Sequence, residues 1–169
     1  SLHQVSSRVL ERHSALTSTR APFIRTNPRV LGNTAAILTF TGGGIYGQLS
    51  LAGSGEYFIS LHRRLRLLER ASLSHDGHDL IAEIVNQVTG ELRQNYFAAR
   101  GLNFTLSPPF TMSGTDVELE FKGHKPSLVI PFDEGEHSVY VEFNYASSAP
   151  PKSPVKTATV PVDGEITFF

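Results

Sequence analysis

The sequence has no cysteine, no long apolar run and no excess of either charge. Without cysteine the chain forms no disulfide, holds no thiolate metal site and has no cysteine nucleophile. No apolar stretch approaches the roughly 20 residues that a membrane-spanning helix needs. The 15 Lys and Arg residues are balanced by 16 Asp and Glu residues, which does not favour nucleic acid or an anionic membrane as a partner. We therefore predict that the chain binds neither.

What the sequence does have is the composition of an ordinary globular domain. Its 169 residues are 40% hydrophobic and 18% charged, and a chain of this length buries a core without metal or disulfide support. The N-terminus, Ser1-Leu2-His3-Gln4, carries neither a signal-peptide pattern nor an initiator Met. We therefore expect a cytoplasmic location and a chain that begins inside a longer protein.

Hydrophobic periodicity predicts helices and a hairpin in the first part of the chain. Val5, Val9, Leu10 and Leu16 recur at helical spacing, and the run 41–44 separates two strand-like segments with glycine at the turn. In chain order we predict a helix at 4–18, a turn-rich connection at 20–33, and strands at 34–40 and 45–51. A helix at 54–68 follows, with Leu65 and Leu68 on its buried side. The last helix of this part is predicted at 76–99, and Gly101 ends it.

After Gly101 the hydrophobic pattern alternates, which is typical of strands. Helix, strands, helices and then strands indicate an α+β domain in which long helices pack on an antiparallel sheet, arranged as two α-β repeats. We place this domain at residues 1–145, followed by a Pro/Ser-rich linker and a small β-hairpin tail at 146–169. The strands predicted after Gly101 are 102–106, 116–121, 128–132 and 138–143.

The helix predicted at 76–99 has two unlike faces. On a helical wheel of about 100° per residue, Asp79, Glu83, Asn86, Gly90 and Arg93 fall in one narrow stripe. Glycine within a helix costs about 0.5–1 kcal/mol relative to alanine, and at position 90 the missing side chain would let a partner backbone come close. Periodicity by itself leaves two interpretations, a solvated face or a docking face, and it names no reaction. The opposite side of the wheel is apolar and consists of Ile81, Ile84, Val85, Val88 and Leu92.

Two rival sites have better structural explanations. His75, His78 and Asp79, with His62 upstream, have a spacing that could serve a metal site. They lie at the start of the helix, however, where a cap and a turn explain them better, and we predict no metal on this chain. The glycine-rich run 41–47 lacks the Lys-Ser/Thr of a phosphate-binding P-loop and leads into a strand instead of a helix. A hairpin turn is the better interpretation of that run.

Four residues in and after the polar helix, Asp79, Glu83, Asn86 and Pro109, have a distinctive spacing. Glu83 follows Asp79 by four residues, Asn86 follows Glu83 by three, and Pro109 follows Asn86 by 23. This spacing resembles the signature of the family of CheC, CheX and FliY chemotaxis phosphatases. Other segments also resemble that family. They are Glu-Ile-Val-Asn-Gln-Val-Thr-Gly along the helix and the later strands 128–132 and 139–143. The resemblance covers residues 30–145, approximately the whole predicted domain.

The resemblance implies a CheC/CheX-like fold and a phosphatase that acts on the aspartyl phosphate of a CheY-like receiver domain. Such a receiver already holds Mg²⁺ and a lysine beside its phosphoryl group, so we expect no cofactor on this chain. By resemblance, Asn86 aligns the attacking water and Glu83 pairs with the receiver lysine. A carboxamide suits the first role because it both donates and accepts hydrogen bonds and stays uncharged beside phosphate. The expected partner-binding residues are Asp79, Gly90, Arg93 and Pro109, the last of which shapes the strand after the helix.

The first predicted helix carries an incomplete second copy of the signature. Ser7, Glu11 and Ser14 have the same spacing, but Ser14 stands where Asn would be and no proline follows at the right distance. A hydroxyl cannot reproduce the reach of a carboxamide. The resemblance therefore favours the CheX type, which has one motif, over the CheC type, which has two. Because CheX relatives are dimers that share a sheet, a homodimer is a further hypothesis.

Two other functions stay open from the sequence. One is a non-catalytic module of the same fold, related to the flagellar switch protein FliM, which binds partners and lacks the Glu and the Asn. The other is a CheX-like domain that docks on a receiver only to sense or scaffold it in two-component signalling. The presence of both Glu83 and Asn86 favours catalysis over either.

Overall fold

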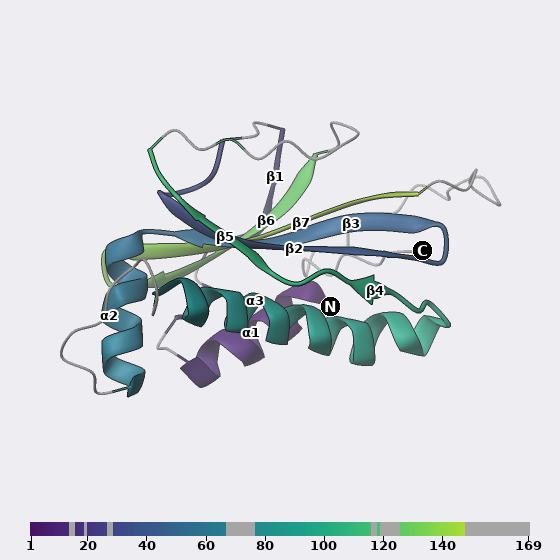
Figure 1. The fold of residues 1–169 in the computed structure, drawn as a ribbon, viewed down its shortest axis with the longest axis horizontal. Helices are drawn as coiled ribbons and strands as arrows, with labels where there is room; N and C mark the ends of the chain where they lie inside the picture. The colour runs from purple at the N-terminus through teal and green to yellow at the C-terminus, as the bar shows by residue number, and fades with distance from the viewer. Residues whose placement is uncertain are drawn as a thin grey trace.

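The computed structural model describes most of the chain before residue 148. In the described residues an antiparallel sheet carries two helices along one face and a third at one end (Figure 1). None of these helices is long and apolar enough to cross a membrane. The described residues are 1–13, 16–18, 20–26, 29–66, 77–115, 118 and 126–147.

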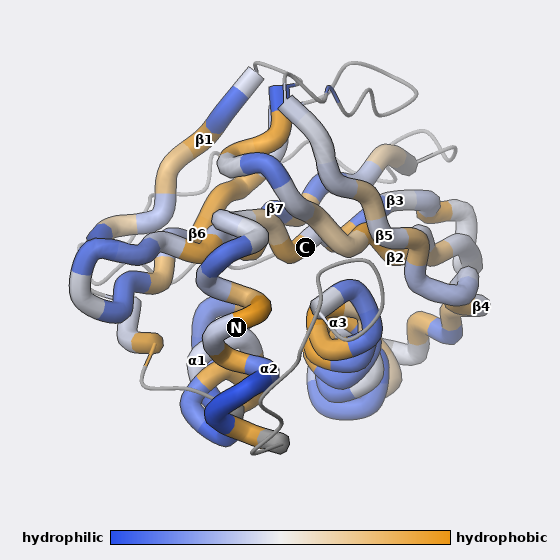
Figure 2. The backbone as a smooth tube through the Cα atoms, turned by 60° about the vertical axis from the view of Figure 1, so that its left-hand side comes forward, coloured by the Kyte–Doolittle hydropathy of each residue, from blue (hydrophilic) through white to orange (hydrophobic). Residues whose placement is uncertain are grey.

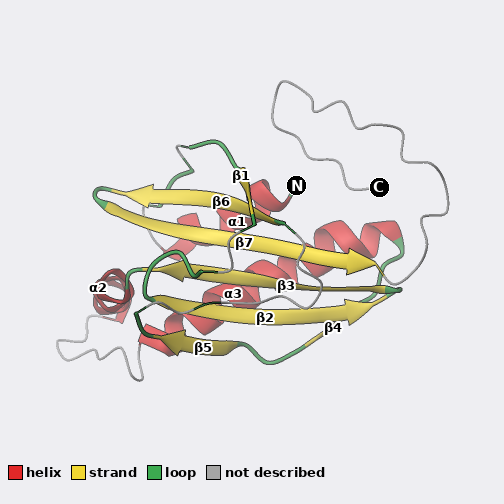
Figure 3. Cartoon of the chain, turned by 90° about the horizontal axis from the view of Figure 1, so that it is seen from above, coloured by secondary structure: helices red, strands yellow, loops and turns green. Residues whose placement is uncertain are grey.

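Two long hairpins lie side by side at the centre of the sheet (Figure 3). The first consists of β2 (Thr34–Gly42) and β3 (Ile45–Gly53), and the second of β6 (Ser127–Glu134) and β7 (His137–Ser147). β3 pairs with β7, and this pairing joins the two halves of the chain. The described strands follow the order β1-β6-β7-β3-β2-β4, with β5 also paired to β2.

The first hairpin confirms the turn that the sequence predicts. Gly42 pairs with Ile45, so only Gly43 and Gly44 form the turn. Their φ angles are 59° and 76°, the left-handed values that a two-residue hairpin turn of the favoured twist requires at both positions. Glycine reaches these angles without steric cost. The same turn explains the glycine-rich run without any phosphate-binding role.

Short strands complete the sheet at its edges. β1 (Phe23–Arg25) pairs with β6, and it lies within the segment predicted as a turn-rich connection. β4 (Thr105–Leu106) is the end of the strand predicted at 102–106. β5 (Phe110–Ser113) directly follows two prolines and was not predicted. Such a strand is difficult to predict from sequence, because proline usually indicates the end of a strand although it is tolerated at the start of an edge strand.

Several predictions concern residues at the margin of the described part. Of the strand predicted at 116–121, only Glu118 is described, and it forms an isolated bridge with Arg29. β7 continues through Ser147, and Ala146 and Ser147 pair with Tyr46 and Ile45 of β3. The first two residues of the predicted linker therefore lie in a strand, and the division into a domain at 1–145 and a tail at 146–169 stays a prediction. The rest of the predicted linker and the tail hairpin lie outside the described residues.

The core lies between one face of the sheet and the helices. α1 (Leu2–His13) and α3 (His78–Leu92) run along this face and contact each other. Figure 2 shows hydrophobic segments of both helices turned toward the sheet. Alternate strand residues form the other side of the core, as expected where one face of a sheet is buried. These are Ala36, Leu38, Phe40, Leu49, Leu51, Ile130, Phe132, Val139, Val141 and Phe143.

The described parts of two helices differ from the predictions. α1 ends at His13 instead of residue 18, and Leu16 joins the core from the connection that follows. α2 (Gly55–Arg66) buries Tyr57, Phe58 and Leu61, but Leu65 is 42% exposed, so its predicted burial is wrong. Only the first turns of α2 lie against the sheet, and its later turns extend away from it (Figure 1). Leu68 lies outside the described residues.

The predicted helix at 76–99 is present but contains a π-helical turn at Arg93–Phe97 and a 3₁₀ turn at Ala98–Arg100. Phe97 follows Arg93 by four residues, so in an uninterrupted α-helix it would share the exposed face of Arg93. The wider π turn instead brings Phe97 against Phe40 and Phe104, with ring centroids 6.2 and 4.7 Å apart. Gly101 ends the helix in the left-handed conformation at φ 69°, as predicted.

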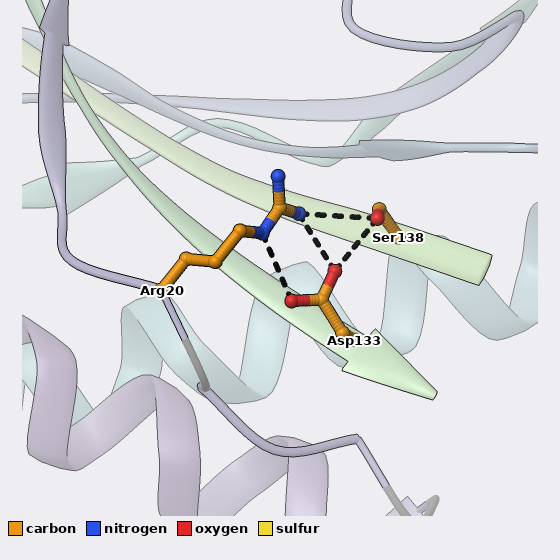
Figure 4. Close-up of polar contacts among 3 residues, drawn as sticks. All are labelled: Arg20, Asp133 and Ser138. Atoms are coloured by element: carbon orange, nitrogen blue, oxygen red, sulfur yellow. Dashed lines mark hydrogen bonds and ion pairs between the residues drawn. The ribbon is translucent and has the colours of Figure 1, made fainter. Parts of the chain in front are cut away.

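The connection after α1 is fastened to the second hairpin. Thr17 and Asp133 exchange backbone hydrogen bonds of 3.1 and 2.9 Å. Arg20 donates from Nε and Nη2 to the two carboxylate oxygens of Asp133, at 2.9 and 2.6 Å, and from Nη2 to Ser138 at 3.1 Å (Figure 4). The bidentate geometry fixes orientation as well as distance. It holds the start of the chain across the edge of the sheet and so supports the placement of α1.

A second polar contact holds α2. The hydroxyl of buried Tyr57 donates to Glu134 Oε2 at 2.6 Å, and Arg64 Nη2 donates to the same oxygen at 3.0 Å. The Arg64 hydrogen bond, helped by that of Tyr57, lowers the pKa of Glu134 below its usual range. A carboxylate with a lowered pKa stabilises the folded state fully above its unfolded-state pKa, and this stabilisation is lost as the pH falls through the folded-state pKa.

We predict that Glu134→Ala lowers the free energy of unfolding by about 1–3 kcal/mol at pH 7, because it leaves the Tyr57 hydroxyl without its acceptor. Tyr57→Phe removes the hydroxyl itself and leaves Glu134 paired with Arg64. The free energy of unfolding should therefore fall less in this variant. Urea denaturation of both variants and the wild type at pH 7 and pH 3 measures these differences. The deficit of Glu134→Ala should shrink at pH 3, and a deficit that does not change with pH would contradict this account.

Candidate functional site

The candidate site is the face of α3 that points away from the sheet. The helix contacts β2, β3, β5 and α1 through its apolar side, and Ile81, Ile84, Val85, Val88 and Leu92 are all at most 3% exposed. Figure 2 shows the hydrophilic segments of α3 on the opposite side. The exposed face carries Asp79, Glu83, Asn86 and Arg93, with the half-buried Gly90 among them.

The structure thus brings the predicted stripe together on one helix. The predicted exposure of Asp79, Glu83, Asn86 and Arg93 is confirmed, and Gly90 is half-buried. The chemical role of each residue stays a prediction. Pro109 lies elsewhere, in the connection between β4 and β5. The strand that it precedes, β5, packs beside α3, and His78 at the start of α3 hydrogen-bonds Ser113 at the end of β5 (Nε2 to Oγ, 2.7 Å). Pro109 is therefore not on α3, and its part in partner binding stays a prediction.

Glu83 and Asn86 differ in how they are held. Gln87, one turn after Glu83, donates from Nε2 to Glu83 Oε1 at 2.7 Å. No side-chain hydrogen bond of Asn86 to another described residue is seen. Gln87 was not among the predicted site residues, although its i, i+4 spacing from Glu83 is the pattern that allows such a bond. The carboxylate is thus oriented within the chain, and the carboxamide is left for an outside partner.

Gly90 interrupts the row of side chains on the exposed face. An added Cβ at this position would meet no atom within 4 Å. The neighbouring Thr89 points the other way and donates from its buried hydroxyl to the Val85 carbonyl at 2.7 Å. Nothing in the described chain therefore requires glycine at position 90, and the gap opens toward solvent.

The second, incomplete motif lies only partly within the described residues. α1 is described as Leu2–His13, and Ser14 lies outside the described part of the chain. Ser7 is half-buried and Glu11 is exposed. α3 carries Asp79, Glu83 and Asn86 of the first motif, all within the described residues.

Among the described residues no group of three or more His, Asp or Glu side chains is placed to hold an ion. His62 is buried in α2, and His78 is bonded to Ser113. His75 lies outside the described part. A hollow in the described surface is lined by Thr39, Phe40, Thr41, Tyr46, Gly47 and residues 105–107, and it contains none of the stripe residues.

The geometry therefore favours chemistry on the surface of a macromolecule. A convex helix face with an oriented carboxylate, an available carboxamide and, one turn after it, a gap at Gly90 can enter a site on another protein. What it can add to such a site is an uncharged group that orients water and a charged group that fixes the docking position.

Comparison with known proteins bears on both fold and family. A family model described as chemotaxis phosphatase CheX matches residues 34–133. A crystal structure of a CheC-like superfamily protein from Shewanella sp. PV-4 has a TM-score of 0.74 at 19% identity, covering 86% of this chain and 95% of that one. The chemotaxis protein CheX from Vibrio vulnificus has a TM-score of 0.74 at 18% identity, covering 86% and 96%.

A third match comes from a complex. A chain of the CheX–CheY–BeF3–Mg²⁺ complex from Borrelia burgdorferi has a TM-score of 0.73 at 16% identity, covering 86% of this chain and 96% of that one. At such identities the structural likeness shows the fold, and it confirms the α+β, CheC/CheX-like fold that the sequence predicts. The comparison with curated proteins found no match.

The open space at Gly90 leads to a stability prediction for the isolated chain. Gly90→Ala should raise the free energy of unfolding by about 0.5–1 kcal/mol, because alanine loses less backbone entropy in a helix and its Cβ meets no atom within 4 Å. Urea denaturation measures the change. Gly47→Ala is the matched control and should destabilise, since its Cβ would lie 2.4 Å from the Asn144 carbonyl oxygen. A loss of stability in Gly90→Ala would show that the chain itself requires glycine there.

Proposed function

Because this chain belongs to the chemotaxis phosphatase CheX family, we propose that it hydrolyses the aspartyl phosphate of a CheY-like response-regulator receiver. The observation that carries the proposal is the exposed pair Glu83 and Asn86, which α3 presents about one helical turn apart. The Borrelia burgdorferi complex of CheX with CheY, BeF3 and Mg²⁺ supports a receiver as the partner.

The proposed reaction divides its parts between two proteins. The receiver contributes the phosphorylated aspartate, the Mg²⁺ ion and a lysine. Phosphoryl transfer to water needs positioning and charge stabilisation more than covalent help. The receiver supplies the charge stabilisation, so this chain must contribute an oriented water molecule and a fixed approach to the phosphorus.

Asn86 is the residue that we propose to orient the water. Its carboxamide is exposed on a helix whose opposite face is locked in the core. The amide oxygen can accept a hydrogen bond from the water while the NH₂ group donates to a phosphoryl oxygen, and neither group adds negative charge beside the phosphate. A rigid helix holds this geometry better than a loop, and orientation of this kind accounts for a large part of the rate.

Glu83 is proposed to anchor the helix on the receiver lysine. The hydrogen bond from Gln87 to Oε1 restricts the rotamer of the carboxylate before docking. A carboxylate has two oxygens and about four acceptor sites, so the bond from Gln87 leaves capacity for an ammonium group. Orientation in advance reduces the entropy that docking must remove.

The other stripe residues are proposed to shape the contact. An alanine at position 90 would add a methyl group on the docking face without any conflict inside the chain, so the glycine suits the close approach of a partner backbone. Asp79 and Arg93 extend the polar face by about one turn in each direction. Pro109 borders it by directing the chain into β5.

The test is phosphate release from a phosphorylated receiver in the presence of Mg²⁺. Asn86→Ala should lower kcat about 100-fold, because the water loses its alignment. Asn95→Ala is the matched control, since Asn95 is also an exposed asparagine but lies in the π turn, and it should keep wild-type kcat. If Asn86→Ala keeps wild-type kcat, the proposed mechanism is wrong even where the activity is present.

The docking role is tested by KM in the same assay. Glu83→Ala and Gly90→Ala should each raise KM about tenfold or more, the first by losing the charge pair and the second by blocking close approach. Glu56→Ala, at an exposed glutamate of α2, should leave KM unchanged. If wild-type chain does not accelerate release but binds the phosphorylated receiver, the chain is a docking or scaffolding module and not a phosphatase.

A further inference from the structure

A pair of arginines flanks the candidate site. Arg12 Nη1 lies 2.7 Å from Glu91 Oε1, and Arg8 Nη1 lies 3.6 Å from Glu91 Oε2. The Arg8 and Arg12 side chains are 58% and 54% exposed, whereas that of Glu91 is 18% exposed. Two cations on one face of α1 thus share a single carboxylate of α3, and the exposed Glu11 stands next to Arg12 on α1.

Fold stability does not explain both cations. Exposed ion pairs contribute about 0.2–1 kcal/mol at most. Val5, Val9 and Leu10 already hold α1 in the core, and each is at most 6% exposed. Among the described residues no second carboxylate pairs with either arginine. A guanidinium has five N–H donors, so most of the donor capacity of the pair is directed at solvent.

The position of the cluster relates it to the stripe. Glu91 follows Gly90 in the last turn of α3, so the two arginines that pair with it lie beside that end of the helix. Arg93 opens the π turn that follows and points to a different side, because it is rotated by about 200° from Glu91. At this end of the two helices Arg8, Arg12 and Arg93 outnumber Glu91 and the exposed Glu11, whereas Asp79 and Glu83 make the other end of α3 acidic.

We propose that Arg8 and Arg12 form a second contact surface, which binds a carboxylate-rich patch on the same phosphorylated receiver. The inference rests on the proposed function and deepens it by naming the surface that selects and orients the partner. The acidic end of α3 approaches the receiver lysine while the cations meet acidic side chains beside it. Charges arranged in this way steer the encounter and suppress a reversed docking orientation.

The test compares KM and kcat of the complete chain with a phosphorylated receiver at low and high salt. The double variant Arg8→Gln with Arg12→Gln should raise KM about tenfold at low salt and leave kcat within about twofold. Its KM should also depend less on salt, because fewer charges are screened. Arg8→Lys with Arg12→Lys keeps both charges and should keep KM within about threefold.

Two further variants separate docking from a structural clamp. Glu91→Gln breaks the same ion pairs but leaves both cations, so docking predicts an unchanged or lower KM, and a clamp predicts a KM as high as that of the double variant. Arg64→Gln is the matched control for net charge. Arg64 is 48% exposed and pairs with a carboxylate that is 19% exposed, but it lies on α2, and its loss should leave KM unchanged.

The outcomes distinguish this inference from the function on which it rests. If the wild-type chain does not accelerate phosphate release, the proposed function is wrong. An active wild-type chain whose KM is the same in the Gln double variant overturns only the role of Arg8 and Arg12. The inference is also overturned if the Lys and Gln double variants raise KM equally, or if Glu91→Gln raises it as much as they do.

Discussion

The burial of one face of α3 against the sheet is the interaction on which the site depends. Its five apolar side chains are at most 3% exposed, and each contributes about 1.5–3 kcal/mol on burial. Rotation of the helix would expose these groups, so the opposite face is held outward with little freedom. The π turn ends this arrangement after Leu92 by rotating Phe97 into the aromatic cluster with Phe40 and Phe104. The stripe thus has a fixed direction and a fixed end.

The elements with long, regular patterns could be predicted from the sequence. The polar helix, both central hairpins and the α+β class follow from periodicity and turn glycines, because those signals are local. The π turn could not be predicted, because it depends on contacts of Phe97 with Phe40 and Phe104, which are distant or separate from the helix in the sequence. β5 was missed because its only local signal is a pair of prolines. The burial predicted for Leu65 was wrong because helical spacing does not reveal where α2 leaves the sheet.

For the candidate site, too, one part could be predicted from the sequence and another part could not. Exposure of Asp79, Glu83, Asn86 and Arg93 follows from the wheel, whereas the reaction comes from the resemblance and from family membership. The cluster of Arg8, Arg12 and Glu91 joins residues 79 positions apart, so only the folded chain brings it beside the stripe. Its combination of acidic and basic ends is a property of two helices together.

The central claim is that an exposed carboxamide on a rigid helix completes a reaction whose other groups belong to the partner. Single-turnover decay of a phosphorylated receiver, with this chain in excess and Mg²⁺ present, tests the claim most directly. The account predicts faster decay than for the receiver alone, and loss of nearly all the acceleration when Asn86 alone becomes alanine. Decay that the chain leaves unchanged, or full acceleration by the Asn86→Ala variant, would contradict it.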